Sequence, residues 1–174
     1  MLFRSLIQLL ELEANCVVAL NMVDEAGEHA PQPAQITEVF GVPCVATSGR
    51  TGHGVPDLKD AIRSALAAPS IATPEVRYPP ALIADINAVV PKLPESWSTG
   101  GSRDRALALW ALNSIDEGDE LVGIEPTLRE EVMRRAEAAK ASQRDIDVEA
   151  ISARYCWLDD HQAVLAPKIG RAHV

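Results

Sequence analysis

Residues 16–24 read Cys16-Val17-Val18-Ala19-Leu20-Asn21-Met22-Val23-Asp24, a short apolar run that ends in polar side chains. The apolar, β-branched part from Cys16 to Asn21 predicts a strand that is buried on both faces, as the strands of parallel sheets are. A second strand of the same kind is predicted at Val42-Pro43-Cys44-Val45-Ala46.

Helical patterns surround these two strands. Apolar residues recur at helical spacing over residues 2–13 and again from Val55 to Leu66. A short helix is expected at residues 34–40, where Gly41 can end it in a left-handed cap. Residues 24–33 are polar and contain proline, so they predict a loop. The order helix, strand, helix, strand, helix predicts an α/β fold with a parallel sheet.

A change of pattern divides the chain. Residues 69–80 hold four prolines and no helical period, which places a domain boundary near residue 70. Four helices are expected beyond it, at residues 81–90, 104–115, 126–142 and 147–165, with Pro126 in a favourable first-turn position. The sequence therefore predicts an α/β domain at residues 1–70, an all-helical domain at residues 71–166, and a tail at residues 167–174.

Charge and composition argue against several classes of function and site. Asp and Glu number 25 against 16 Lys and Arg, so the net charge of −9 argues against nucleic-acid partners and anionic lipid surfaces. No apolar run approaches the roughly 20 residues of a membrane span. The three cysteines are too scattered for a disulfide framework, and Cys16 and Cys44 are expected to be reduced core residues. The histidines form no metal pattern, so no metal site is expected.

Asn21, Met22 and Asp24 follow the first predicted strand at its carboxyl end, where α/β sheets bind ligands. A carboxylate at that point can accept two hydrogen bonds from the N1 and N2 edge of guanine, and adenine cannot supply them. Asn21 could hold the neighbouring loop and reach N7 of the base, while the stem of Met22 lies on the purine face. The alternative is that Asn and Asp follow the strand only because they favour turns.

A second candidate segment, Thr47-Ser48-Gly49-Arg50-Thr51-Gly52-His53-Gly54, follows the second predicted strand. A hydroxyl here, such as that of Ser48, can brace the Asp24 carboxylate, and the backbone N–H of Gly49 can donate to the guanine carbonyl. An ordinary glycine turn is again the alternative. The two segments in this order are more specific for guanine recognition than either is alone.

Together these segments resemble the last two base-recognition motifs of small GTPase domains, and more narrowly those of the ferrous iron transporter B family. That family commonly has Asn-Met-x-Asp where most GTPases have Asn-Lys-x-Asp, and Met22 stands at this position. The resemblance covers roughly residues 2–165. Its other parts are the phrases Val17-Val18-Ala19-Leu20-Asn21, Phe40-Gly41-Val42-Pro43, Arg77-Tyr78-Pro79-Pro80, Ala106-Leu107-Ala108-Leu109-Trp110 and Ala153-Arg154-Tyr155.

The resemblance implies the C-terminal half of a P-loop GTPase-like sheet, followed by a helical domain that steadies bound GDP and relays nucleotide state. It implies GTP or GDP as ligand, with Mg²⁺ bound in the complete protein, and regulation of Fe²⁺ uptake across the bacterial inner membrane. The transmembrane portion of the same full-length protein is the implied partner, a homo-oligomer is possible, and the location is the cytoplasmic side of that membrane.

Two departures from the family pattern stand out. Gly49 replaces the usual Ala, which matters little for a backbone contact. No GxxxxGK[ST] phosphate loop, switch threonine or Asp-x-x-Gly is present, and in the family these lie upstream of the position of Met1. We therefore expect this chain to cradle a base without hydrolysing GTP by itself. Residues 168–174 resemble a translated sequencing adaptor, which would make the chain a truncated gene prediction.

Two other functions stay open at this point. A GTPase of the ribosome-assembly type usually keeps Lys at the position of Met22 and often carries a basic RNA-binding domain, whereas this chain is acidic. A non-enzymatic helical interaction module would make the match of Asn21 and Asp24 accidental.

Overall fold

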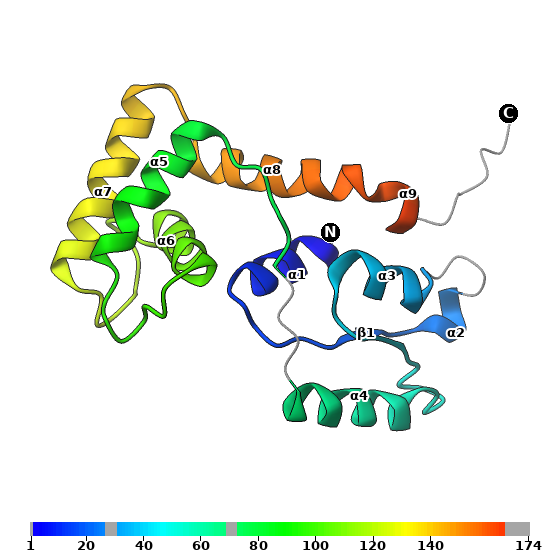
Figure 1. Ribbon diagram of the computed structural model, residues 1–174. Helices are drawn as coiled ribbons and strands as arrows, with labels where there is room; N and C mark the ends of the chain where they lie inside the picture. Colours follow the sequence, from blue (N-terminus) through cyan, green and yellow to red (C-terminus); the bar gives the residue numbers. More distant parts are fainter. Residues whose placement is uncertain (1, 27–30, 69–72, 166–174) are drawn as a thin grey trace, which may run out of the picture. The chain divides into compact units, whose positions relative to one another are not determined.

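The computed structural model describes residues 2–26, 31–68 and 73–165, which form two compact units (Figure 1). Unit 1 comprises residues 2–12 and 75–157, and unit 2 comprises the other described residues. The chain therefore passes between the units after Leu12, after Pro74 and after Trp157. The predicted tail at residues 167–174 and the boundary expected near residue 70 lie outside the described residues.

Unit 2 holds a small parallel sheet. Strand β1 (Val18–Leu20) pairs with β2 (Cys44–Ala46), and Val18, Ala19 and Leu20 lie opposite Cys44, Val45 and Ala46. Helices α3 (Pro33–Phe40) and α4 (Val55–Ala67) both pack on β2 and lie on opposite faces of the strand pair (Figure 1). The short helix α9 (Gln162–Leu165) packs on α3. The predicted α/β fold with a parallel sheet is confirmed.

Helix α3 ends at the residue that the sequence predicts and begins one residue earlier. Pro33 occupies the first turn, and Gly41 ends the helix with φ of 67°, donating its N–H to the Thr37 carbonyl at 2.8 Å. A residue with a Cβ would be strained in this left-handed conformation. Ile36 and Phe40 of α3 are buried, so this helix supplies the apolar cover of the sheet.

Three details of unit 2 differ from the predictions. The strands have three residues each and are not buried on both faces, since Ala19 is exposed and the others are partly exposed. Within the described residues the sheet has only these two strands, so each strand has one edge without a neighbouring strand and stays partly exposed. Cys16 and Cys44 are accordingly only partly buried. The loop expected from Asp24 begins instead as one helical turn, α2 (Val23–Ala26), whose acidic first turn suits a helix N-terminus.

Unit 1 is helical. It contains α1 (Leu2–Glu11), α5 (Pro80–Val89), the 3₁₀ turn η2 (Val90–Lys92), α6 (Ser102–Ser114), α7 (Pro126–Ala141) and most of α8 (Ile146–Asp160). Helices α5 and α7 run side by side, and α6 packs on both (Figure 1). The helices predicted after residue 80 are observed, but the last one is wrong as a single helix because it breaks at His161 before α9.

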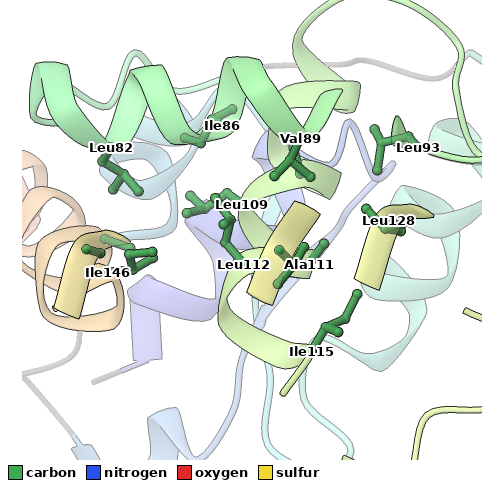
Figure 2. Close-up of a cluster of buried hydrophobic side chains, with 14 residues drawn as sticks. Leu82, Ile86, Val89, Leu93, Leu109, Ala111, Leu112, Ile115, Leu128 and Ile146 are labelled. Atoms are coloured by element: carbon green, nitrogen blue, oxygen red, sulfur yellow. The ribbon is translucent and has the colours of Figure 1, made fainter. Parts of the chain in front are cut away.

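The core of unit 1 is aliphatic. Figure 2 shows Leu82, Ile86 and Val89 of α5 directed toward Leu109 and Leu112 of α6, with further buried side chains from α7 and α8. Trp97 packs at its margin and meets Trp110 edge to face, with ring centroids 6.0 Å apart. Because side chains from four helices interdigitate here, burial of apolar surface is the main stabilising contribution to this unit.

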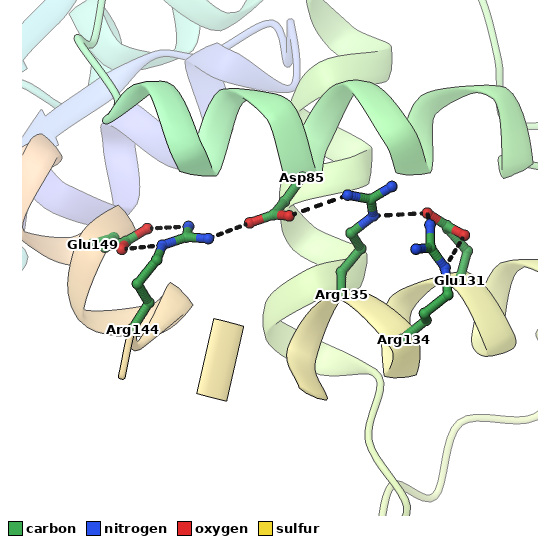
Figure 3. Close-up of polar contacts among 6 residues, drawn as sticks. All are labelled: Asp85, Glu131, Arg134, Arg135, Arg144 and Glu149. Atoms are coloured by element: carbon green, nitrogen blue, oxygen red, sulfur yellow. Dashed lines mark hydrogen bonds and ion pairs between the residues drawn. The ribbon is translucent and has the colours of Figure 1, made fainter. Parts of the chain in front are cut away.

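A chain of alternating charges borders this core (Figure 3). Asp85 of α5 is 5% exposed and accepts a hydrogen bond from Arg144 at 3.0 Å. Its other oxygen lies 3.7 Å from Arg135. Each arginine also pairs with a glutamate, Arg144 with Glu149 at 2.7 Å and Arg135 with Glu131 at 2.9 Å. The buried Asp85 is thus fully paired, which links α5 to α7 and to the start of α8.

A second buried cluster ties α1 into unit 1. Glu11, at the end of α1, accepts hydrogen bonds from the Tyr78 hydroxyl and from Arg154 Nε at 3.0 Å. Glu11 is 8% exposed and Arg154 is 5% exposed, and the guanidinium lies 5.8 Å from the centre of the Tyr78 ring. Burial, together with the Glu11 carboxylate, raises the pKa of Tyr78. Tyr78 is partly buried, and we call Glu11, Tyr78 and Arg154 the buried triad after the buried Glu11–Arg154 pair.

Candidate guanine-base site

The carboxyl ends of β1 and β2 lie side by side, which brings the two candidate segments together. The Thr47 N–H donates to the Leu20 carbonyl at 2.7 Å, and the Val23 N–H donates to the Thr47 carbonyl at 3.3 Å. These bonds continue the strand pairing past the ends of both strands. The residues that follow, from Asn21 and from Ser48 onward, are therefore neighbours, as a parallel sheet requires.

Asn21 holds the second segment through its side chain. Its Oδ1 accepts the backbone N–H of Gly49 at 3.1 Å. The amide group of Asn21 keeps its NH₂ donors, which is the group that could reach an acceptor such as a purine N7. The Gly49 N–H, which the sequence suggested for the guanine carbonyl, is thus engaged with Asn21 in this structure.

Asp24 lies beside the second segment. The Ser48 hydroxyl and, to a smaller extent, Arg50 hold the pKa of Asp24 below its ordinary value, because both donate hydrogen bonds to the ionised form. Arg50 donates to Oδ2 through Nε at 3.0 Å and through Nη2 at 2.5 Å. The Asp24 side chain is 18% exposed, so its carboxylate is partly accessible, with Oδ2 engaged by Arg50.

Ser48 is only 1% exposed, so it supports the neighbouring Asp24 from a buried position. Its hydroxyl oxygen accepts the Thr51 N–H at 3.2 Å, its carbonyl accepts the Gly52 N–H at 2.9 Å, and its own N–H donates to the His53 carbonyl at 3.0 Å. Four contacts, counting that with Asp24, set one turn. The hydroxyl braces the carboxylate from a fixed backbone.

Met22 is an exposed large apolar residue just after the end of β1. Its side chain is 54% exposed, and its backbone has φ of 64°, a left-handed conformation that is uncommon for a residue with a Cβ. A flexible thioether held out in this way at a strand end is suited to lie against a flat apolar face. The structure thus brings Asn21, Met22, Asp24, Ser48 and Gly49 to one end of the sheet.

Arg50 was not predicted as a site residue. Its pairing with Asp24 has no signal in the sequence, since an arginine in a polar, glycine-rich turn is ordinarily a solvated side chain. Only the approach of the two loops brings its guanidinium, which is 71% exposed, to the Asp24 carboxylate.

Metal and membrane features were also sought in the described part of the chain. Within residues 2–26, 31–68 and 73–165, no cluster of three or more His, Cys, Asp or Glu side chains could hold a metal ion. Over the same ranges, no helix has both the length and the apolar character that a membrane crossing needs.

Comparison with known proteins gives a family match for the first third of the chain. Residues 2–62 match the family model described as ferrous iron transport protein B. A 61-residue stretch is 43% identical to a Fe(2+) transport protein A/Fe(2+) transporter FeoB fusion protein of Porphyromonas gingivalis, covering 33% of this chain and 7% of that protein.

Solved structures show the same fold over more of the chain. The cytosolic domain of L. pneumophila FeoB has a TM-score of 0.71 at 20% identity, covering 94% of this chain and 61% of that one. An S. thermophilus NFeoB variant bound to GMPPNP has a TM-score of 0.66 at 21% identity, covering 91% of this chain and 62% of that one. This chain therefore spans less than two thirds of either solved relative. Over residues 2–62 the chain thus matches the ferrous iron transport protein B family, and its fold is similar to that of solved FeoB cytosolic domains.

Proposed function

We propose that this chain recognises the guanine base of GTP or GDP at the carboxyl end of its two-stranded sheet. The observation that carries the proposal is the Asp24 carboxylate at the strand end, which is partly exposed and whose pKa is lowered by the buried Ser48 hydroxyl. Asp24 would accept the N1 and N2 hydrogens of guanine, the Asn21 amide would reach N7, and Met22 would lie on the ring. Ser48 and Gly49 would hold these groups in place through the contacts described above.

The family and its solved members support guanine nucleotide as the ligand. The S. thermophilus relatives were solved with GMPPNP or GDP bound. In the proposal, residues 1–70 are part of a GTP-binding domain and residues 71–166 form the helical domain, which steadies GDP and relays nucleotide state. Groups upstream of this chain would hold the phosphates and Mg²⁺ and supply the chemistry of GTP hydrolysis.

The biological role follows from the same family. We infer that the full-length protein takes up Fe²⁺ across the bacterial inner membrane, with this region on the cytoplasmic side. Its partner would be the transmembrane portion of the same protein, and a homo-oligomer would be compatible with that arrangement. The net charge of −9 and the presence of Met22 in place of Lys favour this role over a ribosome-assembly GTPase.

The test replaces Asp24 with Asn in the full-length protein and compares binding of GTP and XTP. Loss of two hydrogen bonds to a charged acceptor should weaken GTP binding by about 10- to 100-fold. The affinity for XTP should increase, because the Asn NH₂ can donate to the extra carbonyl of xanthine. Asp57→Asn, at an exposed carboxylate in the first turn of α4, is the matched control and should leave both affinities unchanged. An unaltered preference for GTP over XTP in Asp24→Asn would show that the base binds elsewhere.

A further inference from the structure

We propose that Arg50 is an internal stand-in for the guanine base: it occupies the recognition oxygen of Asp24 until a base that offers two hydrogens replaces it. This inference rests on the proposed function and adds a regulatory residue to it. Arg50 would slow the entry of every base, and guanine, unlike adenine, would supply the two donors that Asp24 then loses.

The geometry of the ion pair carries the inference. Arg50 directs two N–H groups, Nε at 3.0 Å and Nη2 at 2.5 Å, to the single oxygen Oδ2 of Asp24. A guanidinium presents adjacent N–H donors along one planar edge, and the N1 and N2 positions of guanine do the same. The Ser48 hydroxyl lowers the pKa of the same carboxyl group, which keeps it ionised when the Arg50 donors leave. Guanine can therefore reach both oxygens of Asp24 only after the Arg50 donors have left Oδ2.

Arg50 is free to leave without disturbing the site. Its side chain is 71% exposed, and the turn that carries it is set by Ser48, through contacts to Thr51, Gly52 and His53 that do not involve the guanidinium. Water can solvate the displaced guanidinium, and exposed ion pairs are weak. Displacement thus exchanges one pair of donors on Asp24 for another, while the braced carboxylate stays in place.

The exchange favours guanine over adenine. Adenine presents an acceptor at N1, so it cannot supply the two donors that Asp24 loses when Arg50 withdraws. An ionised carboxylate that is stripped of donors is costly. With adenine nearby, Arg50 therefore stays on Asp24 and blocks the position of the base. Without Arg50, the carboxylate would be solvated by water, which any base can displace more readily.

The test measures association of fluorescently labelled GDP and ADP with the full-length protein by stopped flow. Arg50→Ala should speed GDP association by about 1.5- to 5-fold, the range that an exposed ion pair allows. ADP association should speed up by a similar factor, because either base has to displace Arg50, and the preference for GDP, which Asp24 provides, should stay. Raising the salt concentration should speed GDP association with the unaltered protein more than with the variant. Screening weakens the Arg50–Asp24 pair, which only the unaltered protein has. Arg50→Lys, whose ammonium lacks the planar pair of donors, should associate with GDP at a rate between those of the unaltered protein and Arg50→Ala.

Arg63→Ala is the matched control for charge. Arg63 pairs with Asp60 at 2.5 Å in the same unit, and its side chain is also 71% exposed. It should leave GDP association unchanged. If Arg50→Ala binds GDP more slowly while Arg63→Ala does not, Arg50 attracts or contacts the nucleotide, and the stand-in role is wrong. If the unaltered protein shows no preference for GDP over ADP, the proposed base site itself fails.

Discussion

At the scale of single residues, position 54 has no room for a side chain. Gly54 has φ of 70°, and a Cβ placed there would lie 1.9 Å from the Ala46 carbonyl oxygen and 3.3 Å from the Thr47 Cα. The glycine lets the turn after Ser48 fold back on the end of β2. The placement of the second candidate segment against the sheet depends on this close approach.

Gly54→Ala should destabilise unit 2 by about 2–5 kcal/mol. The left-handed backbone costs about 1–2 kcal/mol with a Cβ, and overpacking adds about 1–3 kcal/mol. Gly52→Ala is the control, because Gly52 has φ of 78° with nothing within 4 Å of a Cβ. Gly52→Ala should lose only the about 1–2 kcal/mol that a Cβ costs in the left-handed backbone conformation. Hydrogen exchange at the Thr47 amide, which bonds Leu20 across the strand ends, is the readout. Equal protection in the two variants would contradict the steric argument.

At the scale of elements, the buried triad joins three segments that the sequence leaves far apart. Glu11 lies one residue before the chain leaves unit 1, Tyr78 three residues after it returns, and Arg154 three residues before it leaves again. All three passages between the units are therefore anchored near one ion pair inside unit 1. Glu11 belongs to the segment that matches the family model, so packing attaches α1 to α6 and α8 rather than leaving it with β1 alone.

Glu11→Gln should lower the unfolding free energy of unit 1 by about 3 kcal/mol. This is the lower end of the range for breaking a buried pair, because the amide oxygen still accepts one hydrogen bond while Arg154 keeps an uncompensated charge. Urea unfolding followed by tryptophan fluorescence reports on this unit, since Trp97, Trp110 and Trp157 all lie in it.

Two further variants check the cause. Replacing both Glu11 and Arg154 with Met should recover part of the loss, because no charge is then left buried. Arg134→Gln removes a partner of Glu131 that is 57% exposed in the same unit, and it should cost about 0–1 kcal/mol. A double variant less stable than Glu11→Gln would show that the triad is not limited by the buried charge.

At the scale of the whole molecule, ionised carboxylates stabilise the folded state at neutral pH although the net charge is −9. In unit 1 the pKa values of three carboxyl groups are lowered because donors hold the ionised form: Asp104 by the Ser98 hydroxyl, Asp119 by Arg129 and Glu131 by Arg134. Asp119 lies in the loop between α6 and α7, where it accepts two hydrogen bonds from Arg129, at 2.6 and 3.0 Å.

The stability of unit 1 should fall as pH drops below about 4. Unfolded Asp and Glu titrate near pH 4, whereas these three folded groups titrate lower, so in that window the unfolded chain takes up more protons. The contribution is fully present above the unfolded pKa and is lost as pH falls through the folded values. Urea midpoints measured by tryptophan fluorescence at pH 6, 4 and 3 should decrease in that order.

Asp119→Asn removes one of the titrating groups and should make this pH dependence shallower. The same variant is expected to be less stable at pH 6, because Arg129 loses its charged partner. A midpoint that does not change between pH 6 and pH 3 in the unaltered chain would mean that these carboxylates are not held more tightly in the fold than in the unfolded state.

Much of the architecture could be predicted because it depends on near neighbours in the chain. The helical period identified the long helices, Gly41 marked the end of α3, and β-branched runs marked both strands. The meeting of Asn21 with Gly49 could also be anticipated, since parallel strands bring their carboxyl ends together. The base-binding role of these residues stays a prediction. Strand burial was overestimated, because the number of strands in a sheet is not a local property.

The sequence by itself determined the order and type of the elements and placed polar groups at the ends of the strands. Only the tertiary structure decided which charges meet: Arg50 with Asp24, Asp85 with Arg144, and Glu11 with Arg154 across 143 positions. Periodicity and turn chemistry act over a few residues and are visible in any stretch of chain. The partner of a long charged side chain depends on distances that exist only after the helices and strands have packed.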